Sequence, residues 1–139
     1  MSKVAVVYWS GTGNTEAMAD MVAEGIEEAG GQAETIQAGS FSAGKAGEYD
    51  AFAFGCPAMG DEELEDMEFE PMYSEVEPLL GERKVVLFGS FSWNEGAWME
   101  NWRERAQGAG VNVVDSVIAR DYPDGEAEAA CKAAGAKLV

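Results

Sequence analysis

Residues 4–15 read VAVVYWSGTGNT, and this stretch decides the fold class. Its first six residues form an unbroken apolar run, rich in β-branched and aromatic side chains, which predicts a strand buried on both faces. Gly11 and Gly13 then interrupt the run, and the apolar positions of residues 15–29 recur with helical spacing. A buried strand that leads through a short polar turn into a helix is typical of a parallel α/β sheet.

The same alternation of short apolar runs and helical stretches continues along the chain. Further strands are predicted at residues 32–37, 51–55, 85–89 and 111–119, and helices at residues 62–80, 97–109 and 126–138. The polar run at 32–37 suits a strand at the sheet edge. Residues 38–47 suit a loop with one poor helical turn. Pro71 and Pro78 should kink the helix at 62–80 or divide it into two shorter pieces. We therefore expect one domain, residues 1–139, with a doubly wound parallel sheet and helices on both faces.

Charge and composition exclude several classes of function. The chain has 139 residues, of which 9 are basic and 26 acidic, and its formal net charge is −17. Such a charge repels phosphate backbones and anionic bilayers, so we expect no nucleic-acid partner and no role at a membrane surface. The sequence has no His, which excludes Ser-His-Asp and Cys-His catalysis as well as His-containing zinc sites.

The two cysteines, Cys56 and Cys131, cannot form a four-thiolate metal site. No secretory segment precedes them, so we expect free thiols in a reducing cytoplasm and no bound metal. Cys56 is interpreted as a small buried spacer and Cys131 as a packing residue. No apolar run approaches the roughly 18 residues that a membrane span needs.

The turn at residues 10–15, SGTGNT, has the chemistry of an anion site. Its glycines leave backbone N–H groups unshielded, its hydroxyl and amide side chains add donors, and the following helix presents its positive end. A phosphate held without Lys or Arg is the natural ligand. An ordinary polar turn with Asn14 or Thr15 as the helix N-cap explains the same residues. The stretch lacks the Lys of a nucleoside-triphosphate loop and does not follow the G-x-G-x-x-G dinucleotide pattern.

Three stretches at successive strand ends together resemble the flavodoxin family: YWSGTGNT at residues 8–15, GCPAMGDE at 55–62 and FGSFSWNEGAWM at 88–99. They span essentially the whole chain, and the last strand carries no long insertion, so the chain is similar to the short-chain flavodoxins of anaerobic bacteria. The resemblance implies a five-stranded flavodoxin-like sheet of order 2-1-3-4-5 that holds FMN without a covalent bond. It also implies a low-potential, one-electron carrier that shuttles between semiquinone and hydroquinone, rather than an enzyme.

The resemblance implies which residues hold the cofactor, and none of them is catalytic or binds a metal. They are Ser10, Gly11, Thr12, Gly13, Asn14 and Thr15 in the first loop, Ala58, Met59, Gly60, Asp61 and Glu62 in the second, and Ser90, Phe91, Ser92, Trp93 and Gly96 in the third. Trp93 is expected to stack on one face of the flavin and Met59 to lie against the other. The peptide between Gly60 and Asp61 is expected to turn over on one-electron reduction, and Glu62 to accept a hydrogen bond from flavin N3–H.

Other side chains near these loops also have expected roles. Trp98 and Trp102 are spaced as core residues of a helix, whereas Trp9 is a candidate wall of the phosphate site. Ser92 stands where many family members carry Gly, which bears on FMN affinity. Arg120 ends the last strand and is a candidate neighbour of the cofactor's edge.

Acidic residues crowd the second loop, at Asp61, Glu62, Glu63, Glu65 and Asp66. Two compatible interpretations apply. The acids form a solvated helix face, and they form a rim that disfavours negative charge on the cofactor and steers basic redox partner proteins to transient contacts with a monomer. The alternative function is a small FMN-dependent reductase of quinones or nitro compounds on the same fold. A receiver domain is excluded, because the third predicted strand ends in Gly55 and Cys56 where that domain needs an Asp.

Overall fold

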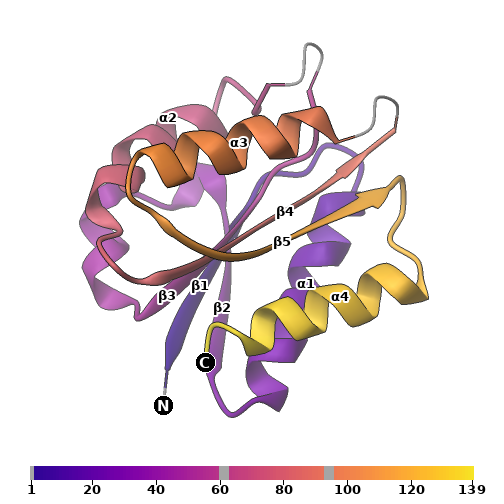
Figure 1. The fold of residues 1–139 in the computed structure, drawn as a ribbon, viewed down its shortest axis with the longest axis horizontal. Coiled ribbons are helices and arrows are strands. Elements are labelled where there is room, and N and C mark those ends of the chain that lie inside the picture. The colour runs from indigo at the N-terminus through magenta and orange to yellow at the C-terminus, as the bar shows by residue number, and fades with distance from the viewer. Residues whose placement is uncertain (1, 60–62, 93–95) are drawn as a thin grey trace.

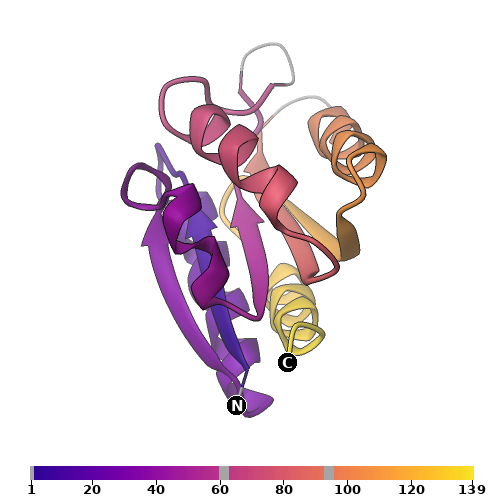
Figure 2. The same ribbon diagram turned by 90° about the vertical axis from the view of Figure 1, so that its left-hand side faces the viewer.

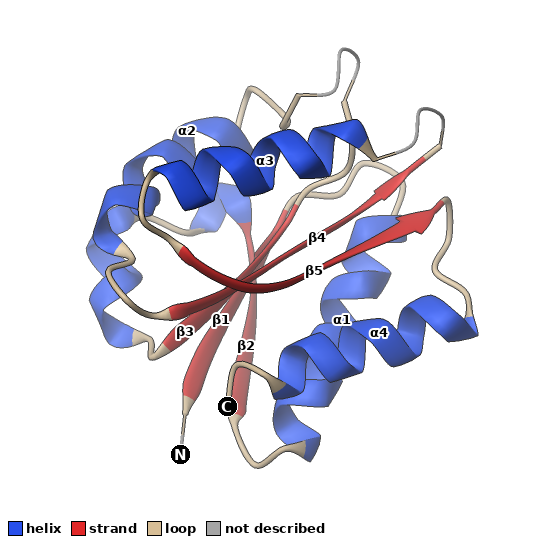
Figure 3. Ribbon diagram, in the orientation of Figure 1, coloured by secondary structure: helices blue, strands red, loops and turns tan. Residues whose placement is uncertain are grey.

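The computed structural model describes residues 2–59, 63–92 and 96–139. Its strands are β1 (Lys3–Tyr8), β2 (Gln32–Gln37), β3 (Ala51–Gly55), β4 (Lys84–Phe91) and β5 (Asn112–Arg120), and its α-helices are α1 (Asn14–Glu28), α2 (Phe69–Val76), α3 (Ala97–Gly108) and α4 (Gly125–Ala136). Short 3₁₀ turns occupy Ala38–Ser40, Ala43–Glu48 and Glu77–Leu79. All strand pairs are parallel and follow the order β2-β1-β3-β4-β5, so the predicted fold class and strand order are confirmed (Figure 1, Figure 3).

Successive side chains of the central strand β1 enter two different hydrophobic cores, one on each face of the sheet. Val4 and Val6 pack in the core that includes residues of α1 and α4. Ala5 and Val7 belong to the core that includes residues of α2 and α3. Figure 1 and Figure 2 show these two helix pairs on opposite sides of the sheet. Because both faces are covered, the inner strands need apolar residues at every position, which explains their unbroken apolar runs.

Aromatic rings fill the core beneath α2 and α3. Phe54 of β3 meets Tyr73 of α2 edge to face at a centroid distance of 5.3 Å, and Phe69 meets Trp102 of α3 at 5.4 Å. Trp98 and Trp102 are almost fully buried, which confirms their assignment to packing. This core fixes both helices against the sheet and so fixes the loops that lead into them.

Helix α2 begins at Phe69, so the predicted start at residue 62 is wrong. The physical reason is the carboxylate of Glu65, which accepts backbone hydrogen bonds at the beginning of the helix and thereby ends the preceding turn. The predicted interruption by proline is confirmed at Pro78, which lies in the 3₁₀ turn that follows α2. It is wrong at Pro71, which lies in the first turn of α2, where an N–H has no helical partner to lose.

Helices α1 and α4 approach each other closely at two glycines. A Cβ added at Gly25 would overlap the backbone carbonyl oxygen of Lys132, and one added at Gly135 would overlap that of Val22. A side chain at either position would therefore push the two helices apart. The sequence signal for this contact is only a pair of glycines inside helical stretches.

The substitution Gly25→Ala should destabilise the protein, although Ala is the better helix former. Separating α1 from α4 costs about 1–3 kcal/mol, which exceeds the gain of about 1 kcal/mol in helix propensity. Urea unfolding followed by circular dichroism measures the difference. Gly108→Ala in α3 is the control, because nothing lies within 4 Å of the added Cβ, and it should leave the stability unchanged or raise it. Equal effects of the two substitutions would contradict the close packing.

Candidate functional site

The three loops singled out in the sequence leave the same edge of the sheet, because β1, β3 and β4 are adjacent and parallel (Figure 3). Backbone hydrogen bonds continue the strand ladder past the strand ends: Trp9 N donates to Gly55 O, Cys56 N to Phe88 O and Ala58 N to Ser90 O, each at 3.0 Å. The structure therefore brings the described parts of the three predicted stretches side by side. This edge is the carboxyl end of the sheet, where ligands of open α/β folds bind.

The first loop, residues 10–15, is a tight turn that leads into α1. Ser10 Oγ accepts a hydrogen bond from Gly13 N at 3.0 Å. Gly13 has φ of 94°, a left-handed conformation that other residues adopt only with strain, and it is the N-cap of α1. The interpretation of Asn14 or Thr15 as the N-cap is therefore wrong.

Several donors of this loop have no protein partner among the described residues. No described side chain caps the first turn of α1, whose N–H groups cannot bond within the helix. The side chains of Thr12 and Asn14 form no hydrogen bond with any other described residue, and Thr12 is exposed. Unpaired N–H, hydroxyl and amide donors at the positive end of a helix suit a phosphate group.

Thr15 and Ser90 tie the first loop to the third. Their hydroxyl oxygens lie 3.0 Å apart, and Ser90 N donates to Thr15 Oγ1 at 3.3 Å. Both residues are buried, so these hydroxyls serve the framework of the site. The two residues are 75 positions apart, and no local pattern could have paired them.

Trp9 lies beside the first loop, and its role as a wall of the phosphate site stays a prediction. Its Nε1 donates to Glu68 Oε1 at 3.2 Å, and the ring lies 3.2 Å from the place where a Cβ of Gly11 would be. Trp9, Ser10, Gly11 and Gly13 line a cavity of about 250 Å³ together with residues that include Glu16 and Glu68. The hydrogen bond from Trp9 to the beginning of α2 was not evident from the sequence.

The described part of the second loop is closed by a short antiparallel bridge. Met59 and Glu63 exchange backbone hydrogen bonds of 3.1 and 3.2 Å, and Ala58 is tied to β4. Met59 and Ala58 are half-buried. The predicted site residues Gly60, Asp61 and Glu62 lie outside the described residues.

In the third loop, Phe91 packs its ring against Trp98 at a centroid distance of 5.7 Å. The guanidinium of Arg120 lies 4.9 Å from the Phe91 ring centroid and donates to the Ser92 carbonyl oxygen at 3.1 Å. Arg120 thus holds the end of β4. Gly96, with φ of 87°, is the N-cap of α3, and the predicted stacking residue Trp93 lies outside the described residues.

Glu65 is buried, so its interpretation as part of a solvated acidic face is wrong, whereas Glu63 and Asp66 are exposed. The Glu65 carboxylate accepts from Met67 N at 2.7 Å, from Glu68 N at 2.8 Å and from Phe69 N at 2.9 Å. Burial raises the pKa of this carboxyl, but the three hydrogen bonds outweigh burial and hold the pKa below its ordinary value. Glu65 therefore serves the fold as an ionised helix cap.

Cys56 and Cys131 are free and buried, as predicted. Across residues 2–59, 63–92 and 96–139, His, Cys, Asp and Glu side chains do not gather in a group of three that could hold a metal ion. None of the described helices is both long and apolar enough to cross a membrane.

Comparison with known proteins gives consistent matches. The family model described as flavodoxin matches residues 6–135. The chain is 44% identical over 135 residues to the flavodoxin of Clostridium beijerinckii, covering 96% of this chain and 97% of that one. It is 41% identical over 132 residues to the flavodoxin of Megasphaera elsdenii, covering 95% of each. The solution structure of two-electron reduced Megasphaera elsdenii flavodoxin matches with a TM-score of 0.88 at 40% identity, over 96% of this chain and 98% of that chain.

The substitution Glu65→Gln should destabilise the protein at neutral pH and have less effect in acid. Because the folded-state pKa of Glu65 is depressed, its carboxylate contributes stability above the ordinary pKa of 4.5, and that contribution is lost as the pH falls through the folded-state value. We expect a loss of about 1–3 kcal/mol at neutral pH, and urea unfolding from neutral pH to about pH 3 measures how the difference shrinks.

Glu75→Gln is the matched control, because Glu75 lies exposed on helix α2 and its side chain forms no hydrogen bond with another described residue. It should change the stability by less than about 0.5 kcal/mol at any of these pH values. A difference between Glu65→Gln and the unmodified protein that stayed constant with pH would rule out the ionised cap.

Proposed function

This chain belongs to the flavodoxin family, and from that membership we propose that it is an electron carrier that holds FMN without a covalent bond. It is of the short-chain type, because it matches relatives of nearly its own length from end to end. The cofactor site is assigned to the carboxyl edge of the sheet, where the three loops converge.

One observation carries the assignment: α1 begins directly after its N-cap Gly13, with no side-chain cap from the described residues, next to a loop of hydroxyl and amide groups. FMN ends in a phosphate monoester, which is a dianion near neutral pH. Ser10, Thr12 and Asn14 supply neutral donors, and the first-turn N–H groups of α1 add backbone donors. These residues fit the phosphate without a cationic side chain.

The flavin ring is assigned to the second and third loops. The described residues that would surround it are Ala58, Met59, Ser90, Phe91, Ser92 and Gly96. Gly60, Asp61, Glu62 and Trp93 complete the predicted set, lie outside the described residues, and keep their roles as predictions. Met59 offers a polarizable side chain for one face of the ring.

When bound, FMN supplies the redox chemistry, since its ring system takes up and returns electrons. The residues of this chain bind it, orient it and set the electrostatic field around it. Glu63 and Asp66 are exposed on the second loop, and the net charge of −17 makes any additional negative charge at this edge unfavourable. This field supports a low-potential, one-electron carrier.

The proposed partners are basic redox proteins that dock transiently, because a strongly acidic surface attracts cationic ones. We assign the whole chain, residues 1–139, to one FMN-binding domain that works as a monomer in the cytoplasm. No substrate of its own is assigned, and the protein with its cofactor should not oxidise NAD(P)H in the absence of a reductase.

The protein freed of its cofactor should bind FMN at least a hundredfold more tightly than riboflavin, which lacks the phosphate. Each hydrogen bond to a charged group contributes about 1.5–3 kcal/mol, and the loop offers several. Quenching of flavin fluorescence during titration measures both affinities. Equal affinities would exclude the phosphate site.

Ser10→Ala should weaken FMN binding about tenfold or more, because it removes a hydroxyl from the phosphate site and the acceptor for Gly13 N. Its affinity for riboflavin should change much less. Ser42→Ala, at an exposed serine outside the residue ranges of the three loops, is the matched control and should bind both flavins like the unmodified protein.

The rate of electron transfer to a basic protein should fall as the salt concentration rises. Salt screens the attraction between the acidic surface and a cationic partner, with a Debye length of about 8 Å at physiological ionic strength. Stopped-flow absorbance with a basic cytochrome measures the second-order rate constant. A redox protein of net negative charge is the control, for which the rate should rise, and a rate independent of salt for the basic partner would contradict the proposed docking.

A further inference from the structure

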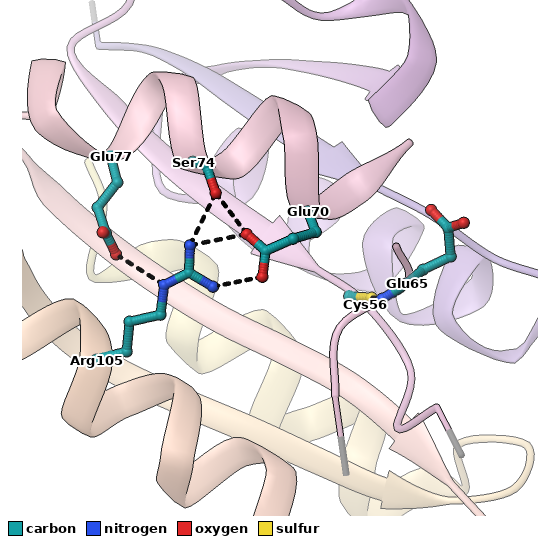
Figure 4. Close-up of polar contacts among 6 residues, drawn as sticks. All are labelled: Cys56, Glu65, Glu70, Ser74, Glu77 and Arg105. Atoms are coloured by element: carbon teal, nitrogen blue, oxygen red, sulfur yellow. Dashed lines mark hydrogen bonds and ion pairs between the residues drawn. The ribbon is translucent and has the colours of Figure 1, made fainter. Parts of the chain in front are cut away.

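Cys56 lies at a junction of the elements that carry the second and third loops. It directly follows β3 and is fully buried. Its carbonyl oxygen accepts from Trp98 Nε1 of α3 at 3.2 Å, and its N–H donates to Phe88 of β4. Its sulfur accepts from Glu65 N at 3.3 Å, as Figure 4 shows. A residue interpreted from the sequence as a spacer therefore contacts three segments at once.

The contact between Cys56 and Glu65 and the bridge between Met59 and Glu63 together form what we call the loop neck. The bridge closes the neck with hydrogen bonds of 3.1 and 3.2 Å. Ala58, beside the bridge, donates to β4. Since the Glu65 carboxylate is bound to the start of α2, the sulfur of Cys56 fixes the distance between the end of β3 and that helix.

The surroundings of Cys56 favour a neutral thiol in this position. Burial raises the pKa of the Cys56 thiol to about 12, and the thiol donates to Pro57 O at 3.6 Å. The absence of a side chain at Gly89 lets the Cys56 carbonyl and the Trp98 ring lie close to β4. A Cβ at position 89 would overlap the Cys56 carbonyl oxygen and come within 3.1 Å of the Trp98 ring. An alanine at position 56 would leave the buried N–H of Glu65 without an acceptor.

We propose that Cys56 is a positioning residue for the cofactor: its sulfur sets the width of the loop neck and thereby where Ala58 and Met59 lie against FMN. The inference rests on the proposed function, because it takes these two residues as part of the FMN site. It does not make Cys56 a ligand or a redox group, since the sulfur acts only through the backbone of Glu65.

The test compares Cys56→Ala with Cys131→Ala in the protein carrying FMN. Cys131 is also a fully buried free thiol, but it packs in α4 on the opposite face of the sheet. Both substitutions should lower the stability to urea. Only Cys56→Ala should weaken FMN binding, about tenfold, and change the ratio of affinities for oxidised and one-electron-reduced FMN about threefold, which corresponds to about 28 mV in the midpoint potential of that one-electron couple.

Cys56→Ser is the second variant and keeps an acceptor of shorter reach. Cys56→Ser should recover most of the FMN affinity and still show a measurable shift of the FMN midpoint potential. If Cys56→Ala does not fold, the test relies on Cys56→Ser. An unchanged potential in the variant that folds, or an equal shift in Cys131→Ala, would overturn the inference. If the unmodified protein itself did not bind FMN, the proposed function would fail first, so the two failures are distinguishable.

Discussion

The parallel hydrogen-bond ladder of β1, β3 and β4 is the constraint on which the rest of the structure depends. It does not stop where the strands end, because backbone N–H groups just beyond β1 and β3 continue it onto the neighbouring strand: Trp9 donates to Gly55, Cys56 to Phe88 and Ala58 to Ser90. The starting positions of the three loops are therefore fixed relative to one another along the strand direction. Without this constraint the hydroxyl-rich turn at residues 10–15 would be an isolated anion site, with no second and third loop to hold a ring beside it.

The four described α-helices begin in two different ways, and the difference agrees with the proposed site. A carboxylate occupies the first-turn donors of α2, through Glu65, and of α4, where Asp124 accepts from Ala127 N at 2.9 Å. Helices α1 and α3 instead begin at a left-handed glycine with no side-chain cap from the described residues. A carboxylate bound at a helix start uses the N–H donors that an anionic ligand would need. Such caps stabilise α2 and α4, whereas the first-turn donors of α1 stay available to a ligand.

Most of the fold could be predicted because the inner strands β1, β3 and β4 are buried on both faces and their apolar runs are unambiguous. The start of α2 could not be predicted, because it depends on the buried carboxylate of Glu65, which in the sequence looks like one of several loop acids. Local motifs were enough to single out the candidate site, but they did not reveal the contacts that support it. The pair Thr15 and Ser90 joins residues 75 positions apart, and the role of Cys56 depends on a backbone N–H that no pattern marks.

At the proposed site, a chain of net charge −17 can hold a phosphate dianion without a cationic side chain. The reason is that attraction by hydrogen bonds and repulsion by carboxylates act over different ranges. Hydrogen bonds from the first loop act at contact distance, whereas repulsion from scattered carboxylates is screened within about 8 Å. The two carboxylates of the adjoining cavity are engaged by neutral donors, Glu16 by Tyr8 Oη at 2.9 Å and Glu68 by Trp9 Nε1 at 3.2 Å. At the other end of the proposed site the second loop carries exposed Glu63 and Asp66, with no comparable neutral donors bound to them among the described residues. The same acidity that phosphate binding tolerates therefore opposes each electron added to the ring, which is the property that a low-potential carrier needs.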